Sequence, residues 1–288
     1  MRIKYLDKIY ILHYAPLKER KVYLERRLNE LGLESYSEWI TSEKDEKFEK
    51  KELSFYDPSE KALKERRRVL GHNWAKIGRL DIIMNLQHLN LLKRIATKNS
   101  NKVSMVCEDD ILLEKDFPEK LSLTIKKLSK IKWDICYTDK GALFVEPKKV
   151  EEELFLYFPK DRRSNTTGSY LITGRSAKKF VRLRKNFSIS PDNEMSFIQK
   201  KYKMRVCWAL PFLTHQGSIE KVYVSNVRTG TLTGDFLRII KKIDRVSPML
   251  ARYVAKNANR LRNAANESRI LGGLKKIVKD YKKYSISS

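Results

Sequence analysis

The sequence predicts an α/β protein with an open, mainly parallel sheet flanked by helices. Short apolar runs typical of buried strands alternate with longer runs of helical periodicity between residues 8 and 186. The chain has 288 residues, enough to bury a substantial core, and its 41% hydrophobic and 33% charged residues are typical of a globular protein. Ligands bind at the carboxyl ends of the strands in such sheets. Polar residues that directly follow a strand are therefore the first candidates for a functional site.

Strands and helices alternate in the first half of the chain. The expected strands are 8–14 (KIYILHY), 37–40 and 102–110, and the expected helices are 17–33 and 81–97. The first helix is amphipathic and ends at Gly32. Between these elements, residues 43–68 are highly charged with weak periodicity. That segment is either a surface loop or a helical excursion.

The alternation continues through the second half. Pro118 is well placed for the first turn of a helix over 117–131. Strands are expected at 133–138 and 168–173, with a helix at 174–186 between the latter strand and the segment SPDNEMSF. This order of elements favours a parallel sheet with helical crossovers.

The formal net charge of +26 predicts an anionic partner, such as nucleic acid, an acidic membrane surface or a phosphorylated small molecule. The charge is uneven, because the chain from Arg238 onward is basic and nearly free of acids. We expect a catalytic domain at 1–235, with a variable charged insertion at 43–80, and a basic helical region at 236–288. Apolar residues recur there at helical spacing, so the region either lies on an anionic membrane surface or packs on the domain.

Neither a signal peptide nor a membrane span is expected. The N-terminal apolar stretch is short and interrupted, and no run approaches the roughly 20 apolar residues that cross a bilayer. The cysteines are scattered and odd in number, which favours buried thiols in a reducing compartment: Cys107, Cys136 and Cys207. We therefore expect a cytoplasmic protein that is peripheral at the membrane if its basic region binds lipid.

Three neighbouring carboxylates end the predicted strand 102–110. If the backbone stays extended, Glu108 and Asp110 point to the same side, because side chains alternate with period two. A divalent cation would relieve the repulsion between them, and carboxylate oxygens favour Mg²⁺ or Mn²⁺. The remaining ligands would come from substrate phosphates and water. The alternative is a loop start in which Asp109 or Asp110 caps the next element.

Several sequence blocks occur in a specific order over residues 8–217: IYILHYAPLKERKVYLERRLNELGL, LDIIMNLQHLNLLKRI, VSMVCEDDILLEKDF, TTGSYLITGRSAKKFV, SPDNEMSF and MRVCWALPFLTHQG. In this order they resemble glycosyltransferase family 25, the lipooligosaccharide and collagen-type sugar transferases. Gln87 stands where the family usually has Ser, and Asn193 falls where it has Asp. The segment 43–80 has no counterpart in the family pattern.

The resemblance implies a GT-A fold with a Rossmann-like nucleotide-sugar domain and sugar transfer with inversion. A Mn²⁺ or Mg²⁺ ion held by Asp110, with Glu108 or Asp109 helping, would bridge the phosphates of a UDP-sugar. Asp192 or Glu194 would deprotonate the acceptor hydroxyl. The alternative for Asp192 is a cap at the start of the following helix.

The resemblance also suggests further binding residues. Near the nucleotide we expect Tyr10, Leu12, His13, Arg20 and His88, although an ordinary surface Arg and a hydrogen-bonded core His are the alternatives for the last two. His215 is a possible additional metal ligand. On the acceptor side we expect Gly168, where the backbone can approach closely, and Tyr170, as an exposed aromatic platform for a sugar ring.

Two other functions are carried as alternatives. A nucleic-acid-binding protein would suit the charge, but the chain has no recognisable zinc ligand set, RRM signature or KH loop. A non-catalytic relative of the transferases is disfavoured by the retained acidic motifs. The resemblance implies UDP-galactose or UDP-glucose as the donor and a glycan or glycoconjugate as the acceptor.

Overall fold

The computed structural model describes residues 3–43, 48–71, 77–98, 101–140, 153–164 and 166–217. All of them belong to one compact unit, Met1–Tyr223, and the second unit, Val224–Ser288, lies outside the described residues. The predicted basic region 236–288 and the boundary at 235 therefore also lie outside them and stay predictions.

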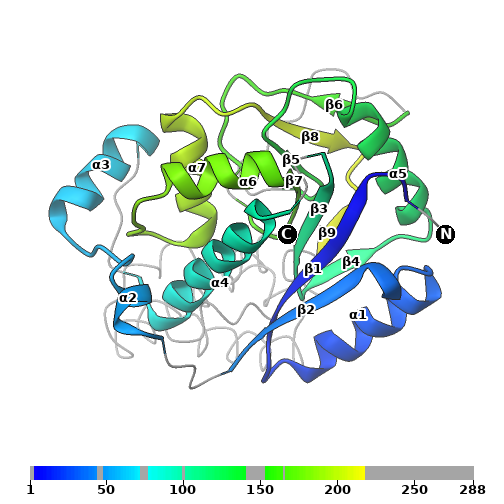
Figure 1. The fold of residues 1–288 in the computed structure, drawn as a ribbon, viewed down its shortest axis with the longest axis horizontal. Helices are drawn as coiled ribbons and strands as arrows, with labels where there is room; N and C mark the ends of the chain where they lie inside the picture. The colour runs from blue at the N-terminus through cyan, green and yellow to red at the C-terminus, as the bar shows by residue number, and fades with distance from the viewer. Residues whose placement is uncertain are drawn as a thin grey trace, which may run out of the picture. The chain divides into compact units, whose positions relative to one another are not determined.

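The elements follow the expected alternation (Figure 1). The strands are β1 (Leu6–Tyr14), β2 (Ser37–Ser42), β3 (Val103–Glu108), β4 (Ile111–Leu113), β5 (Ile135–Tyr137), β6 (Phe155–Tyr157), β7 (Ser169–Thr173), β8 (Val206–Leu210) and β9 (Thr214–Gln216). The α-helices are α1 (Lys18–Glu30), α2 (Lys50–Leu53), α3 (Glu60–Leu70), α4 (Arg79–Ala96), α5 (Phe117–Leu128), α6 (Gly174–Leu183) and α7 (Pro191–Lys201). The sequence did not predict β4, β6 or β9, each of which has only three residues.

A seven-stranded sheet in the order β2-β1-β3-β7-β5-β8-β6 forms the centre of the domain. β2, β1 and β3 are parallel to one another, and β5 is parallel to β8. β7 runs antiparallel to both β3 and β5, and β6 runs antiparallel to β8. The predicted α/β class and mainly parallel sheet are confirmed. The antiparallel strand in the middle of the sheet was not expected.

Two apolar cores lie on the two faces of the sheet, because alternate strand residues point to opposite sides. Ile9, Ile11 and Met105 share one core with α1 and α5. Tyr10 and Val106 share the other core with α3, α4, α6 and α7. Figure 1 shows α4, α6 and α7 gathered on one side of the strands.

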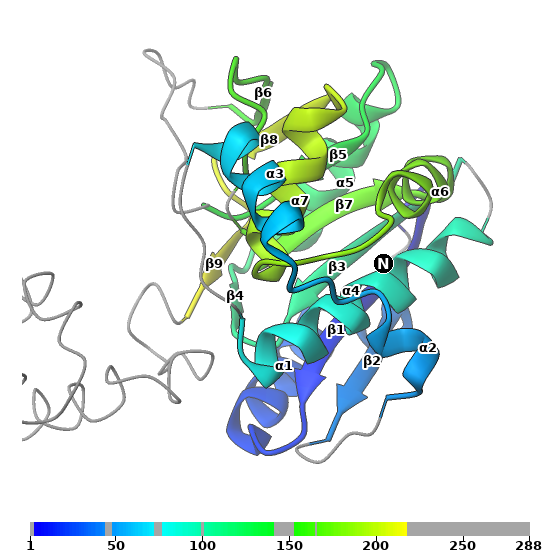
Figure 2. The same cartoon turned by 90° about the vertical axis from the view of Figure 1, so that its left-hand side faces the viewer.

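The charged segment after β2 is a helical excursion rather than a loop. Ser59 caps α3 by accepting a hydrogen bond from the backbone N–H of Ala62. Gly71 ends the helix in the left-handed conformation, at φ 81°, where glycine is favoured over residues with a Cβ. Figure 2 shows α3 alongside α7, and the two helices are in contact. A segment without a counterpart in the family pattern therefore packs on the helix that carries Asp192.

The three cysteines are buried free thiols, as predicted. Among the described helices, none combines the length and the apolar character that crossing a bilayer requires.

Candidate active site

Polar residues from several strands meet at one edge of the sheet. β1, β3 and β5 point their carboxyl ends to this edge, and the antiparallel β7 begins there. The backbone N–H of Glu108 donates to the carbonyl of Gly168, and that of Thr138 donates to Ser169. The edge is thus closed by the loop that enters β7 as well as by the loops that leave β1, β3 and β5.

The three acidic residues after β3 do not continue the extended strand. β3 ends at Glu108, and residues 109 and 110 form a turn before β4. The period-two expectation therefore applies only up to Glu108, which shares the face of Val106 and the α4 layer. Asp109 faces the side of α1 instead. The turn distributes the three carboxylates among different partners.

Asp109 is a buried anchor for the end of β1 and for α1. One carboxylate oxygen lies 2.8 Å from His13 Nδ1 and accepts the backbone N–H of Tyr14 at 3.2 Å, and the other accepts from Arg20 Nη1 at 2.9 Å. Asp109 is only 4% exposed. The predicted residues His13, Arg20 and Asp109 are therefore brought together, with the carboxylate engaged by the protein itself.

Glu108 turns toward α4 and the loop before β7. Thr167 donates a hydrogen bond to its Oε1 at 2.5 Å, and His88 Nε2 lies 3.9 Å from the same oxygen. Burial alone would raise the pKa of the Glu108 carboxyl, but His88, Thr167 and the charge of Arg20 outweigh it and lower that pKa. His88 is fully buried and also contacts the Tyr170 hydroxyl at 3.2 Å. Glu108 is thereby held as a carboxylate.

Asp110 lies where the turn enters a small two-stranded ribbon. Its carbonyl accepts the backbone N–H of Gly217, and β4 pairs with β9 so that Leu112 is opposite His215. His215 is thus held in the ribbon that begins directly after Asp110. The described residues nevertheless contain no group of three or more His, Cys, Asp or Glu side chains placed to hold a metal ion. The predicted metal trio of Asp110, Glu108 and His215 is therefore not assembled by these side chains alone.

Asp139 is a site residue that the sequence reading missed. It follows β5, is fully buried, and accepts a hydrogen bond from Thr166 Oγ1 at 2.7 Å. Burial raises the pKa of Asp139 to about 7; the nearby carboxylates of Glu108 and Asp110 add to the rise, which the hydrogen bond from Thr166 opposes. Its Oδ1 has no hydrogen-bond partner within the described part of the chain. A polar residue directly after the run WDICYT was the signal that could have identified it.

Gly168 lies in a space that admits no side chain. A Cβ added there would come within 2.2 Å of Gln216 Nε2 and 2.4 Å of Asp139 Oδ2. Such distances are shorter than real Cβ contacts, so these neighbours would have to move for any side chain at this position, and the acceptor role of Gly168 stays a prediction. The groups that approach it belong to the protein.

Asp192 and Glu194 occupy different environments although both are in the first turn of α7. The helix begins at Pro191 after the N-cap Ser190, so Asp192 is inside the helix rather than its cap. Burial raises the pKa of Asp192, and the charge of Glu108 adds to that rise, while hydrogen bonds with Ser190 and Asn193 oppose it. Burial raises the pKa of Asp81 in α4 and of Tyr137 in β5, and the charge of Asp192 adds to both rises, so Asp192 lies within electrostatic range of the start of α4 as well as of the acidic edge.

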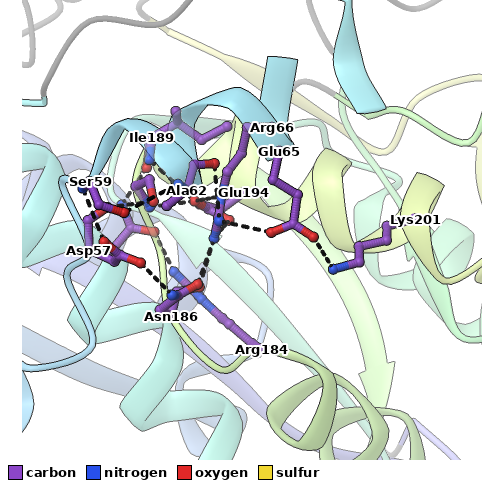
Figure 3. A network of polar contacts seen from close by, with 12 residues as sticks. Asp57, Ser59, Ala62, Glu65, Arg66, Arg184, Asn186, Ile189, Glu194 and Lys201 are labelled. Carbon is purple, nitrogen blue, oxygen red and sulfur yellow. Dashed lines mark hydrogen bonds and ion pairs between the residues drawn. The ribbon is translucent and has the colours of Figure 1, made fainter. Parts of the chain in front are cut away.

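Glu194 is fully buried in a polar network with α3 (Figure 3). Its Oε1 accepts hydrogen bonds from Arg66 Nε at 3.0 Å and from the backbone N–H groups of Ser188 and Ile189 at 2.5 and 3.2 Å. Because Glu194 is fully buried and its carboxylate is engaged by Arg66 and by the turn before α7, an acceptor hydroxyl cannot reach it. Of the two predicted candidates for the base, this geometry favours Asp192.

Three other predicted binding residues lie in the core. Tyr10 and Leu12 are 0% and 2% exposed and pack in the core that faces α4, because alternation directs both away from the α1 side. Tyr170 is also fully buried, with its ring 6.1 Å from that of His88. The prediction that Tyr170 is an exposed platform is wrong, and direct ligand contact by Tyr10 or Leu12 does not fit their burial. Tyr170 instead packs against the His88 ring and contacts its Nδ1 through the hydroxyl.

The comparison with protein families decides what kind of protein contains this edge. Residues 8–195 match the family model described as glycosyltransferase family 25 (LPS biosynthesis protein). The chain belongs to glycosyltransferase family 25. The resemblance seen in the sequence blocks is confirmed, and the acidic edge belongs to a glycosyltransferase-family domain rather than to a nucleic-acid-binding module.

Other comparisons add little to the family assignment. No curated protein matches this family 25 chain. Among solved structures, the inositol-1-phosphate CTP transferase from T. maritima is similar at 14% sequence identity, covering 72% of this chain and 68% of that chain, with a TM-score of 0.29. A likeness at this TM-score supports no conclusion about fold or function.

Proposed function

We propose that this family 25 chain is a metal-dependent, inverting glycosyltransferase with a GT-A fold. It transfers a hexose, galactose or glucose, from a UDP-sugar to a hydroxyl of a glycan or glycoconjugate acceptor in surface polysaccharide or lipooligosaccharide synthesis. The main support is the family assignment, together with the acidic residues Glu108, Asp110 and Asp139 that lie where β3 and β5 end at the carboxyl edge of the sheet. Burial is the main cause of the raised pKa of Asp139, and the charges of Glu108 and Asp110 add to it; a bound cation would relieve that repulsion.

The donor set suits Mg²⁺ or Mn²⁺. The groups are carboxylates, one of them with an orphaned buried oxygen on Asp139, and no thiolate is among them. Such ions commonly use one or two protein carboxylates and take their other ligands from substrate phosphates and water. Asp110 and Glu108 would hold the ion, with His215 as a possible further ligand. When bound, it would neutralise charge on the diphosphate leaving group.

The residues of the chain supply the remaining functions. Asp109 fixes Arg20 and His13 at the same edge, where the guanidinium can attract a phosphate. Asp192 accepts the proton of the acceptor hydroxyl as that oxygen attacks the anomeric carbon from the face opposite the leaving group. The raised pKa of Asp192 suits this role, because a base works best when its pKa approaches the working pH. The single displacement inverts the anomeric centre.

Binding of UDP tests the proposal before any acceptor is known. We expect UDP with Mn²⁺ to raise the melting temperature of the wild-type protein, and Asp110→Asn to remove that shift without changing the melting temperature of the free protein greatly. A screen of UDP-sugars for metal-dependent hydrolysis, followed by glycan acceptors, would identify the substrates. If no UDP binds and no nucleotide sugar is turned over, the proposal fails. Vesicles containing anionic lipid would test separately whether the basic region 236–288 brings the enzyme to a membrane surface.

A further inference from the structure

The buried pair Arg66–Glu194 joins α3 to α7 in the helical layer (Figure 3). The side chains of Arg66 and Glu194 are 2% and 0% exposed. A buried ion pair contributes little net stability compared with apolar residues of the same size, because both charges lose their hydration. A role in orientation is therefore a better explanation for it than a role in overall stability.

Glu194 fixes the chain where it enters α7. The same oxygen that binds Arg66 also accepts the backbone N–H groups of Ser188 and Ile189. Residues two apart on an α-helix point about 200° apart around its axis. With Glu194 directed at α3, Asp192 is directed away from α3, which agrees with the influence of Glu108 on Asp192.

The segment before α3 is attached to the same turn. Phe187 exchanges backbone hydrogen bonds with this segment, donating to Phe55 and accepting from Asp57, both at 2.8 Å. Arg66 Nη2 reaches the carbonyl and the side-chain oxygen of Asn186, and Asn186 Nδ2 donates to Asp57 at 2.9 Å. The excursion after β2 thus holds the turn before α7 through backbone and side chains together.

We propose that Arg66 is a positioning residue, which acts through Glu194 to fix the direction of Asp192 at the acidic edge. The segment that lacks a counterpart in the family pattern therefore sets the geometry of the acceptor side in this enzyme. This inference rests on the proposed function, in which Asp192 accepts the proton of the acceptor hydroxyl. The donor side, built on Glu108 and Asp110, does not depend on the pair.

A double variant separates orientation from stability. Arg66→Met/Glu194→Gln removes both charges, so no buried charge is left unpaired, and it deletes the hydrogen bonds by which Arg66 holds Glu194 and Asn186. We expect the variant to fold and to bind UDP with Mn²⁺ within about twofold of the wild type, while kcat for sugar transfer falls about 10- to 100-fold, because misplacement by about 1 Å costs this much. The acid limb of the kcat–pH profile should shift, since the surroundings of Asp192 change.

The matched control is Lys201→Met. Lys201 pairs with Glu65 across the same two helices, but at the last turn of α7 and partly exposed to solvent. We expect this variant to keep the wild-type kcat and pH profile. Wild-type kcat in the Arg66/Glu194 double variant, or an equal loss in Lys201→Met, would overturn the inference. A loss of UDP affinity as large as the loss of kcat would also overturn it.

Two further measurements cover the other results. If the double variant does not fold, Arg66→Lys is the substitute, because it keeps the charge but cannot contact Glu194 and Asn186 at once as the guanidinium does. We expect a three- to tenfold fall in kcat with unchanged UDP binding. Unchanged kcat would contradict the inference. If the wild type transfers no sugar at all, the proposed function fails. The positioning can then still be tested by hydrogen exchange, which should become faster in residues 188–194 of the double variant, and unchanged exchange would refute it.

Discussion

Replacing Asp109 by Ala should destabilise the fold strongly, although Asp109 lies in the acidic motif. The substitution removes three partners at once and leaves the Arg20 side chain, 11% exposed, without its carboxylate. Breaking a buried ion pair by deleting one partner costs about 3–5 kcal/mol. For a domain of this size each kcal/mol lowers the melting temperature by about 2–4 °C, so we expect a fall of about 6–20 °C.

Chemical denaturation followed by circular dichroism, together with calorimetry, measures this loss. Glu25→Ala is the matched control, because Glu25 pairs with Lys21 on the same helix α1 at 3.7 Å but is half-exposed. An exposed pair is worth about 0–1 kcal/mol, so the control should unfold almost as the wild type does. The double variant Asp109→Ala/Arg20→Met should recover part of the loss, since no unpaired charge remains. A loss below about 1 kcal/mol in Asp109→Ala would refute the anchoring role.

Three further predictions concern the same edge and the core. Gly168→Ala should lower stability by about 1–3 kcal/mol by overpacking and reduce activity, because its Cβ would displace Gln216 and Asp139; a denaturation midpoint equal to that of the wild type would contradict the tight packing. In the folded state Asp139 keeps its proton up to a pH of about 7, whereas in the unfolded chain it loses it near pH 4. In protein stripped of divalent cations, the free energy of unfolding should therefore fall by up to about 4 kcal/mol as pH rises from about 4 to about 7. Urea titrations at several pH values should show this slope in the wild type and not in Asp139→Asn. Burial raises the pKa of the Cys107 and Cys207 thiols, so native protein should react with a thiol reagent only as fast as it unfolds; rapid labelling at neutral pH would disprove their burial.

The sequence was sufficient for the class of fold and for the location of the acidic motif. Apolar runs such as 8–14 and 102–110 are long, continuous and followed by polar residues, so both the strands and the edge at which they end could be inferred. The direction of β7 could not, because a short buried strand reads alike in parallel and antiparallel pairing. Because β7 is antiparallel to its neighbours, it begins at the edge where they end. Thr166, Thr167 and Gly168 therefore lie at that edge although they come before their strand.

The roles within the site depended on contacts that are distant in sequence. Glu194 could be separated from Asp192 only after Arg66 was seen against it, more than one hundred residues earlier in the chain. Tyr170 has the residue type of a sugar platform, and only its position beneath α4 identifies it as a core residue. Asp139 directly follows the expected strand 133–138, but a single Asp there forms no motif, and only its burial and its hydrogen bond with Thr166 distinguish it.

The position of β7 has a consequence for how the chain is made. β1, β2 and β3 find their partners among themselves, whereas the neighbours of β5 are β7 and β8, which leave the ribosome later. A nascent chain that has emerged only as far as β5 exposes the apolar flank of β3, and such an edge readily pairs with a second chain. Glu108 meets Thr167 only once β7 has docked. The acidic edge can therefore be completed only after β7 has emerged and docked, and until then the exposed flank of β3 makes the chain prone to aggregate.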